Sequence, residues 1–382
     1  MYNLWSIFWT SLKLGLTSFG GPAAHLGYFQ QIYVKQKKWL TDEEYLDLVA
    51  LSQFLPGPAS SQVGMGIGLR KGGVAGSIAA FIGFTLPSVL MLIAFVYIME
   101  RFQFNIGWLQ GLKIVAVAIV AQAILDMGKK ILKTPLQYVL LIVVTIILLY
   151  TTSIYSQIGV LIGSAMIGYL FLKQPGQSIP SIVFSKKWGA VFLSSFFVLL
   201  IGLPIAAKIL KWEWLVLFEK FYLAGSLVFG GGHVVLPLLE SQFVGTYVTA
   251  ESFLAGYGLT QAVPGPLFTF ASYLGMVIGG IPIALLATVA IFLPAFLLIV
   301  GAYPFWSSIS SHQALRGAVA GMNVAVIGIL IAAFMSPILT STVRDVMDGF
   351  WAIVLFVLLV KFKLKPWIIV VIGVLIGFTF YR

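Results

Sequence analysis

The chain has no cysteine and very few charged residues, and each shortage excludes a class of protein. Without cysteine it can form neither a disulfide nor a thiolate metal site. Charged residues make up 9% of the sequence, against roughly 25% in a soluble domain, so a water-facing surface could not be covered. The sequence also lacks a His-Glu-x-x-His run, a phosphate-binding Gly-Lys-Ser/Thr loop and a nucleophile elbow, which argues against an enzyme. We expect no metal and no cofactor.

Long apolar stretches rich in Leu, Ile, Val and Ala fill most of the chain. The clearest are residues 74–99, 114–127, 136–150, 158–172, 190–207, 281–300, 318–334, 350–360 and 367–381. Most approach the length of about 20 residues that crosses a bilayer as a helix, and none shows the alternation of a β-barrel strand. The first residues lack a basic region and a small-residue cleavage site, so no cleaved signal peptide is expected. The sequence therefore predicts an all-α, multi-pass integral membrane protein.

One set of motifs occurs twice in the same order. Ser18-Phe19-Gly20-Gly21-Pro22 reappears as Val228-Phe229-Gly230-Gly231-Gly232, and Ser52-Gln53-Phe54-Leu55-Pro56-Gly57-Pro58 reappears as Thr260-Gln261-Ala262-Val263-Pro264-Gly265-Pro266. Further matches are Gly68, Gly72-Gly73 and Pro87 with Gly275, Gly279-Gly280 and Pro294. Ordered matches of this length indicate a duplication. We assign the two repeats to residues 1–187 and 188–382.

The basic residues indicate how the two copies are oriented. Loops of the first copy hold Lys35, Lys37, Lys38, Arg70 and Lys71, whereas the matching loops of the second hold no Lys or Arg. Because basic loops stay cytoplasmic, the copies should face opposite ways. The excess of basic residues behind the net charge of +11 thus reflects membrane topology. We therefore do not expect nucleic acid as a partner. Inverted-topology repeats are typical of secondary transporters, with a channel as the alternative.

Glycine and proline interrupt apolar segments that are mostly too short to cross a membrane alone. Gly20-Gly21-Pro22 divides residues 1–34, and Pro56-Gly57-Pro58 divides residues 45–69. Because basic loops flank the second segment on both sides, it should enter the membrane and return as a re-entrant helical hairpin. A helix that begins at such a break has unpaired N–H groups and a dipole that favours an anion. Four breaks brought together would form an anion site near mid-membrane.

The residues expected around the anion are glycines and neutral or weakly basic polar residues beside the four breaks. They are Ser18, Gly20, Gly21, His25, Gln53, Gly57, Ser60, Ser61, Gly231, Gly232, His233, Gln261, Gly265 and Thr269. The alternative is that the small residues only allow helices to pack closely. Glu240 and His25 are candidates for proton coupling, although Glu240 could instead pair with Lys220 or Lys211. Lys13 and Lys113, the lysines placed inside helices, could neutralise a dianion or reach an interface.

At these residues the chain resembles the chromate ion transporter family. The similarity lies in SFGGPAAHLGYF (18–29), WLTDEEYLDLVALSQFLPGPASSQVG (39–64), GFTLPS (83–88), FGGGHVVLPLLE (229–240) and QAVPGPLFTFASYLG (261–275). The two-repeat length is similar to the family's long, fused form. The resemblance implies export of chromate, with sulfate as its analogue, at the bacterial inner membrane. Residues 134–187 and 340–382 carry none of these motifs.

The sequence as a whole favours a secondary transporter that exports chromate-like oxyanions, driven by membrane potential or by proton exchange. A proton-coupled importer of a sulfate-type anion and an anion channel are the alternatives. The expected partners are the small oxyanion and the lipid bilayer, and a homodimer stays open as the assembly.

Overall fold

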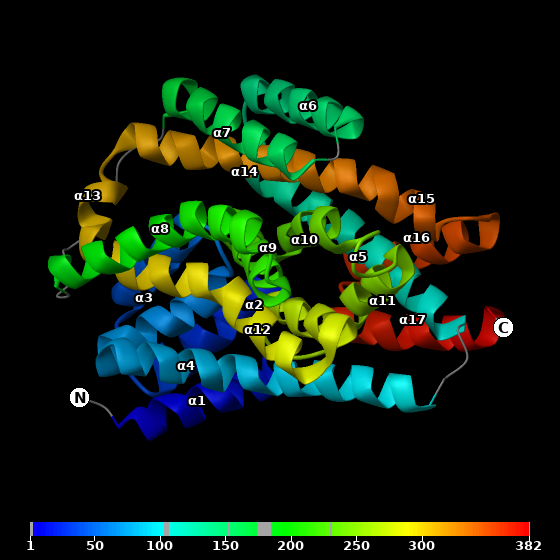
Figure 1. Ribbon diagram of the computed structural model, residues 1–382, viewed down its shortest axis with the longest axis horizontal. Coiled ribbons are helices and arrows are strands. Elements are labelled where there is room, and N and C mark those ends of the chain that lie inside the picture. The colour runs from blue at the N-terminus through cyan, green and yellow to red at the C-terminus, as the bar shows by residue number, and fades with distance from the viewer. Residues whose placement is uncertain (1–2, 103–106, 152, 174–184, 230, 382) are drawn as a thin grey trace.

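The fold was analysed in a computed structural model that describes the chain except residues 1–2, 103–106, 152, 174–184, 230 and 382. The described residues form helices and no β-strand (Figure 1). The first half contains α1 (Leu4–Thr17), α2 (Gly21–Phe29), η1 (Gln30–Gln36), α3 (Asp42–Phe54), α4 (Ala59–Phe102), α5 (Gly107–Ile131), α6 (Pro135–Tyr150) and α7 (Ile154–Phe171). The second contains α8 (Lys186–Leu210), α9 (Glu213–Leu227), η2 (Gly232–Val234), α10 (Val235–Phe243), α11 (Ala250–Thr260), η3 (Leu267–Thr269), α12 (Phe270–Ala302), η4 (Tyr303–Phe305), α13 (Trp306–Ser310), α14 (Gln313–Ala333), η5 (Phe334–Leu339), α15 (Thr340–Thr342), α16 (Val346–Val360) and α17 (Pro366–Phe380).

The two halves repeat one order of helices with reversed direction. The series α1 to α7 is matched by α9, α10, α11, α12, α14, α16 and α17, and α8 lies between the two series. In Figure 1, α4 runs from left to right and its counterpart α12 from right to left, while α5 and α14 show the opposite pair of directions. The inverted repeats expected from the sequence are thus confirmed.

Both long helices of the hairpins contain a sharp reversal at a repeated glycine pair. Gly72 and Gly73 have φ/ψ values of −139°/18° and 63°/−157°, and Gly279 and Gly280 have −159°/29° and 71°/−161°. The second glycine of each pair lies in the positive-φ region that side chains disfavour. Each reversal separates a short arm, residues 59–71 or 267–278, from a long apolar helix, as the re-entrant hairpin requires.

Local sequence explains where the short hairpin helices begin. The Thr41 side chain accepts from the Glu44 amide at 3.2 Å, and the Glu44 carboxylate accepts from the Thr41 amide at 2.9 Å, which forms a capping box for α3. The acidic first turn also complements the helix dipole. In the second repeat, Thr249 caps α11 through the Ser252 amide. Each hairpin therefore starts at a defined residue on the membrane surface.

The last helices of each repeat pack on the other repeat, through glycine. A Cβ atom at Gly111 of α5 would overlap the carbonyl oxygen of Gly373 in α17. In the same way, a Cβ at Gly317 of α14 would overlap the carbonyl oxygen of Gly168 in α7. These contacts bring the helix backbones together, as small residues do in membranes. The last helix of each repeat thus packs on a helix of the other repeat. These contacts therefore join residues on the two sides of the boundary between residues 187 and 188.

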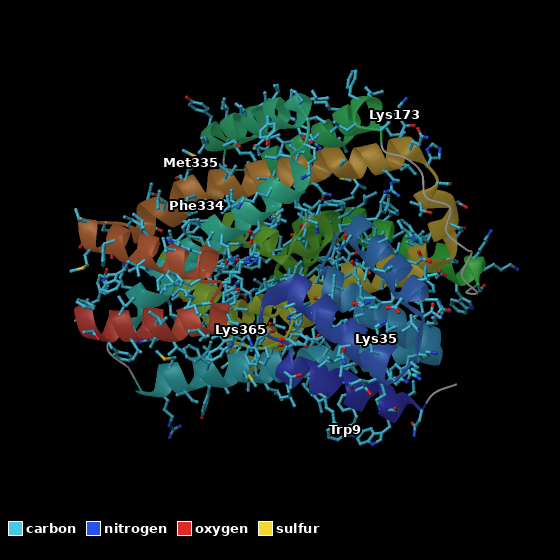
Figure 2. All side chains as sticks on the ribbon, turned by 180° about the vertical axis from the view of Figure 1, so that it is seen from behind. Trp9, Lys35, Lys173, Phe334, Met335 and Lys365 are labelled. Atoms are coloured by element: carbon cyan, nitrogen blue, oxygen red, sulfur yellow. The ribbon has the colours of Figure 1, made fainter. Side chains whose placement is uncertain are left out.

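The outer surface of the bundle is apolar. Ile142 of α6, Val198 of α8 and Ile353 of α16 are 57%, 68% and 65% exposed. Trp9 also projects from the outside of α1 (Figure 2). Six helices in the described part of the chain are long and apolar enough to cross a membrane. Exposed apolar side chains on these helices and on the shorter apolar helices α6 and α16 are suited to lipid rather than water, in agreement with a multi-pass membrane protein.

Candidate anion site

The tip of each re-entrant hairpin is bonded to the broken helix of the other repeat. The Gly57 amide donates to the Val228 carbonyl at 2.7 Å, and the Gly265 amide donates to the Ser18 carbonyl at 2.9 Å. Val228 and Ser18 occupy matching positions in the two copies. Glycine is needed at both tips, because φ is +118° at Gly57 and +108° at Gly265.

Each tip also packs closely on the long helix of the opposite repeat. A Cβ at Gly57 would lie 3.1 Å from the Cβ of Ala295, and a Cβ at Gly265 would lie 2.7 Å from the Oγ of Ser88. Ser88 and Ala295 are again matching positions, each following the repeated proline. Neither residue was expected from the sequence to lie at the site, although the neighbouring Pro87 and Pro294 belong to the repeated motifs and mark the place.

The amides that remain for a ligand are those after the tips, rather than the tip glycines themselves. The Gly57 and Gly265 amides are already used in the bonds between repeats. In the first turn of α4, the amides of Ala59, Ser60 and Ser61 precede the first intrahelical bond, which Gln62 donates to Pro58. In the second repeat, η3 begins at Leu267 and its first bond comes from Thr269. From the sequence, the anion is expected close to the tip glycines. Because the amides of these glycines are already paired, the free amides are those of the residues that follow each tip.

Polar side-chain atoms without a partner are concentrated beside these amides. Buried atoms that lack a hydrogen bond among the described residues include the hydroxyls of Ser18 and Ser61, His25 Nε2, Gln62 Oε1 and Gln261 Nε2. These side chains are between 0% and 7% exposed. Buried polar atoms are nearly always paired in folded proteins, so an unpaired group of this kind indicates a site for a polar ligand or water.

Further contacts join the predicted residues from the two repeats. His25 Nδ1 lies 3.2 Å from Ser60 Oγ, which links the first broken helix to the hairpin of its own repeat. A Cβ at Gly232 would lie 3.2 Å from Leu267 and 3.6 Å from Pro22, so the two broken helices meet there. The structure therefore brings all four breaks together, as the sequence predicts.

Two of the predicted polar side chains already have a hydrogen-bond partner within the protein. His233 Nδ1 is 2.6 Å from the hydroxyl of Tyr257, a partner that the sequence did not suggest. The Thr269 hydroxyl donates to the Pro266 carbonyl at 2.7 Å and so completes the turn before α12. Gly21 and Gly231, at the starts of their second arms, are partly buried.

The tip glycines of both repeats are buried, but the glutamines that precede them differ in exposure. Gln261 is only 7% exposed, whereas its counterpart Gln53 is exposed on α3. Gly20, in the first broken helix, is exposed as well. The same motif therefore occupies two environments in one chain, with the first copy more open than the second.

Glu240 is buried in α10 without a basic partner. It is 7% exposed and its Oε1 atom has no hydrogen bond among the described residues. The expected ion pair with Lys220 or Lys211 is wrong, since neither amine lies within 4 Å and Lys220 instead reaches the Gln242 carbonyl. Its counterpart Gln30 donates to Asp42 at 3.0 Å, but the residue that matches Asp42 is Ala250. The second repeat thus lacks the partner that the first one has.

The two lysines that the sequence places inside helices lie away from the tips. Lys13 is exposed on α1, which fits a side chain that reaches an interface. Lys113 is 3% exposed on α5, in electrostatic range of Glu251, in the first turn of α11, and of Asp348. Across the described residues, no group of three His, Cys, Asp or Glu side chains could hold a metal. The tips therefore offer neutral donors and helix dipoles.

Comparison with known proteins gives one family over both repeats. The sequence model of the chromate transporter family matches residues 5–169 and 215–378. The chain is 29% identical to a chromate transport protein of Cupriavidus metallidurans, over 100% of this chain and 94% of that protein. It is 26% identical to a chromate transport protein of Pseudomonas aeruginosa, covering 84% and 77%, and 25% identical to an uncharacterized transporter of Methanocaldococcus jannaschii, covering 98% and 93%. No solved structure matches the chain significantly.

Proposed function

Because the chain belongs to the chromate transporter family, we propose that it is a secondary transporter that exports chromate-like oxyanions, including sulfate, by alternating access. The observation that carries this proposal is the group of unpaired, buried polar atoms where the four helix breaks meet. Both repeats of one chain supply these groups, so a homodimer is not required for the site. Residues 1–187 and 188–382 are the two repeats in this proposal.

The chemistry of the tips suits a tetrahedral oxyanion that only accepts hydrogen bonds. Ser18, Ser61 and Gln261 supply hydroxyl and amide donors, and the first-turn amides of α4 supply more. The helix dipole adds about 0.3–2 kcal/mol of attraction for an anion at such a terminus. Neutral donors and helix dipoles hold the anion firmly enough to select it and weakly enough to release it.

The different burial of the two copies supports alternating access. The first copy's Gln53 is exposed and the second copy's Gln261 is buried. In the proposed cycle, the two repeats exchange these environments, so the site opens to one side of the membrane at a time. The bonds from Gly57 to Val228 and from Gly265 to Ser18 couple the two sides during the exchange.

Membrane potential is sufficient to drive the export of a dianion. Moving one charge across 100 mV changes the free energy by about 2.3 kcal/mol. Export of a dianion from a negative interior is therefore favoured by ~4.6 kcal/mol. This corresponds to a concentration ratio of over about a thousandfold. Uptake against the same potential would need about two protons per dianion.

Flux into or out of proteoliposomes tests the proposal. Purified protein is reconstituted with chromate or sulfate on one side, and a potassium diffusion potential of either sign is imposed. Saturable efflux that follows the potential, with counterflow of unlabelled anion, is expected. Absence of flux for both anions contradicts the proposal, and flux without counterflow or saturation indicates a channel instead.

Glu240 favours proton-coupled uptake as the second candidate. A carboxyl that is 7% exposed and has no basic partner is a group that can carry a proton through a cycle. His25, whose Nε2 is unpaired, is the other candidate for this role. The direction of net sulfate flux under an imposed pH gradient, without a potential, distinguishes the importer from the exporter.

A further inference from the structure

A large pocket lies on the side of the bundle, and Phe229 of the second repeat's helix break forms part of its lining. It has a volume of about 830 Å³ and is enclosed by α7, α8, α9, α10 and α14. Its wall combines α7 of the first repeat with helices of the second. The oxyanion site does not use it, because most of its lining is apolar.

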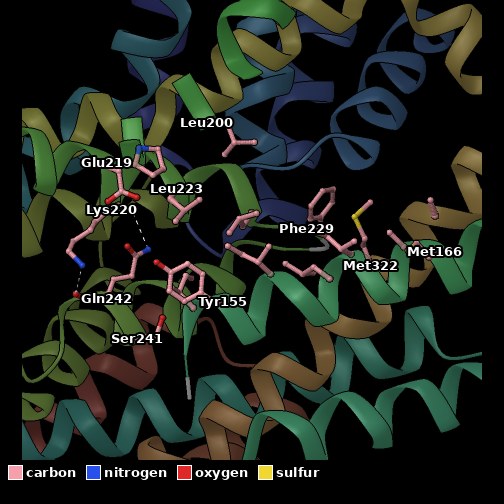
Figure 3. Close-up of a pocket in the computed structure, with 18 of the residues that line it drawn as sticks. Tyr155, Met166, Leu200, Glu219, Lys220, Leu223, Phe229, Ser241, Gln242 and Met322 are labelled. Atoms are coloured by element: carbon pink, nitrogen blue, oxygen red, sulfur yellow. Dashed lines mark hydrogen bonds between the residues drawn. The ribbon is translucent and has the colours of Figure 1, made fainter. Parts of the chain in front are cut away.

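The pocket is polar at one end and apolar at the other. Glu219, Lys220 and Gln242 lie together at one end, near the ring of Tyr155 (Figure 3). Met166 and Met322 lie away from this group in the same view. A ligand that fills the space must therefore have a polar head and an apolar body.

The wall formed by α7 is open to lipid. Tyr155 is 81% exposed, Ile162 58% and Met166 62%. Trp212 and Trp214, at the start of α9, stack with centroids 5.8 Å apart and are half exposed, as expected of aromatic residues at a membrane interface. Lys220 follows Trp214 by six residues, which is about 9 Å along a helix. The Lys220 amine reaches the Gln242 carbonyl in the last turn of α10, so the polar end lies beside the loop that follows this helix.

The polar end carries one charge of each sign. Lys220 Nζ has only a long contact of 3.5 Å to the Gln242 carbonyl and lies 6.0 Å from the centre of the Tyr247 ring. In the described part of the chain, Glu219 forms no ion pair within 4 Å. Two neighbouring, half-buried and unsatisfied charges of opposite sign are complementary to a zwitterionic headgroup.

We propose that this pocket binds phosphatidylethanolamine from the bilayer. Its phosphate is placed at Lys220 and its ammonium group at Glu219, while an acyl chain lies along Met166 and Met322. The ammonium group can donate hydrogen bonds to a carboxylate, which the methylated headgroup of phosphatidylcholine cannot do. An anionic lipid such as phosphatidylglycerol would leave Glu219 facing a phosphate. The site is independent of the proposed transport function.

Native mass spectrometry of the full chain in mild detergent tests this inference. The delipidated protein is titrated with phosphatidylethanolamine, phosphatidylcholine and phosphatidylglycerol of identical acyl chains. One phosphatidylethanolamine should bind at least about tenfold more tightly than either of the others, as one charge-assisted hydrogen bond allows. Equal binding of the three lipids overturns the proposal, since it indicates lipid around the protein without a headgroup site.

Three variants connect the preference to the pocket. Glu219→Gln should remove the preference over phosphatidylcholine, and Glu219→Lys should reverse it in favour of phosphatidylglycerol. Ala165→Trp, in the pocket wall, should reduce binding of the preferred lipid by blocking the acyl chain. Lys211→Gln is the matched control, because Lys211 is an exposed lysine outside the pocket lining. An unchanged preference in Glu219→Gln and Glu219→Lys, which both keep the pocket's shape, contradicts the assignment even if Ala165→Trp misfolds.

Discussion

The Gly57 amide nitrogen lies 2.7 Å from the carbonyl oxygen of Val228, and this bond joins a hairpin tip of one repeat to the helix break of the other. The bond from Gly265 to Ser18 reproduces it in the second copy. The backbone at each helix break is therefore held in place partly by a hydrogen bond from the other repeat. A backbone carbonyl freed by an interrupted helix is satisfied inside the membrane, where water is absent.

Replacing either tip glycine with alanine should destabilise the protein and reduce transport. Gly57→Ala and Gly265→Ala place a side chain at positive φ and against Ala295 or Ser88, at a cost of about 1–3 kcal/mol. Gly202→Ala in α8 is the control, since a Cβ there meets nothing within 4 Å. Thermal unfolding in detergent should show a lower Tm for the tip variants only. Equal Tm values for all three would mean that the tips are not constrained as described.

Packing of α7 against α14 should depend on Gly168 of α7 and not on Gly163 of the same helix. A Cβ at Gly168 would overlap the Gly317 carbonyl, whereas a Cβ at Gly163 meets nothing within 4 Å. Gly168→Ala should therefore lower the free energy of unfolding by about 1–3 kcal/mol through overpacking. Gly163→Ala should be neutral or slightly stabilising. The measurement is the Tm of both variants, and similar losses would argue against this packing.

Much of the fold follows from the sequence because its signals are local. Apolar length predicts the helices, and the repeated glycine and proline positions predict the breaks at Gly57 and Gly265. The packing of α17 on α5 and of α7 on α14 was not predictable, because a glycine such as Gly111 permits close approach without specifying its partner. The sequence left open whether Glu240 forms an ion pair or carries a proton, because sequence distance to Lys220 and Lys211 does not fix side-chain geometry.

The absence of cysteine makes the different exposure of Gln53 and Gln261 directly measurable. Gln53→Cys and Gln261→Cys each introduce a single thiol at matching positions that differ in exposure. A membrane-impermeant maleimide should label the first rapidly, from one face of the membrane, and the second slowly. Substrate should change the two rates in opposite directions if the copies exchange environments. Equal rates from both faces would contradict the asymmetry.

Glu240→Gln should separate the two proposed coupling modes. The amide keeps the shape of the side chain but carries no proton, so pH-driven sulfate uptake should be lost while potential-driven chromate efflux continues. Glu213→Gln is the control, because Glu213 is exposed at the start of α9. The measurement is flux under a pH gradient and, separately, under a potential. Retained pH-driven uptake in Glu240→Gln would remove this residue from coupling.

The exchanged glycine contacts determine when the chain can finish folding during synthesis. Gly111 of α5 meets Gly373 of α17, which is synthesised 262 residues later, so α5 enters the bilayer long before its partner leaves the ribosome. Until then, its glycine face is covered by lipid or by the insertion machinery. The first half is therefore not an independent folding unit, and the order of biosynthesis leaves the closing of the bundle to the final helix.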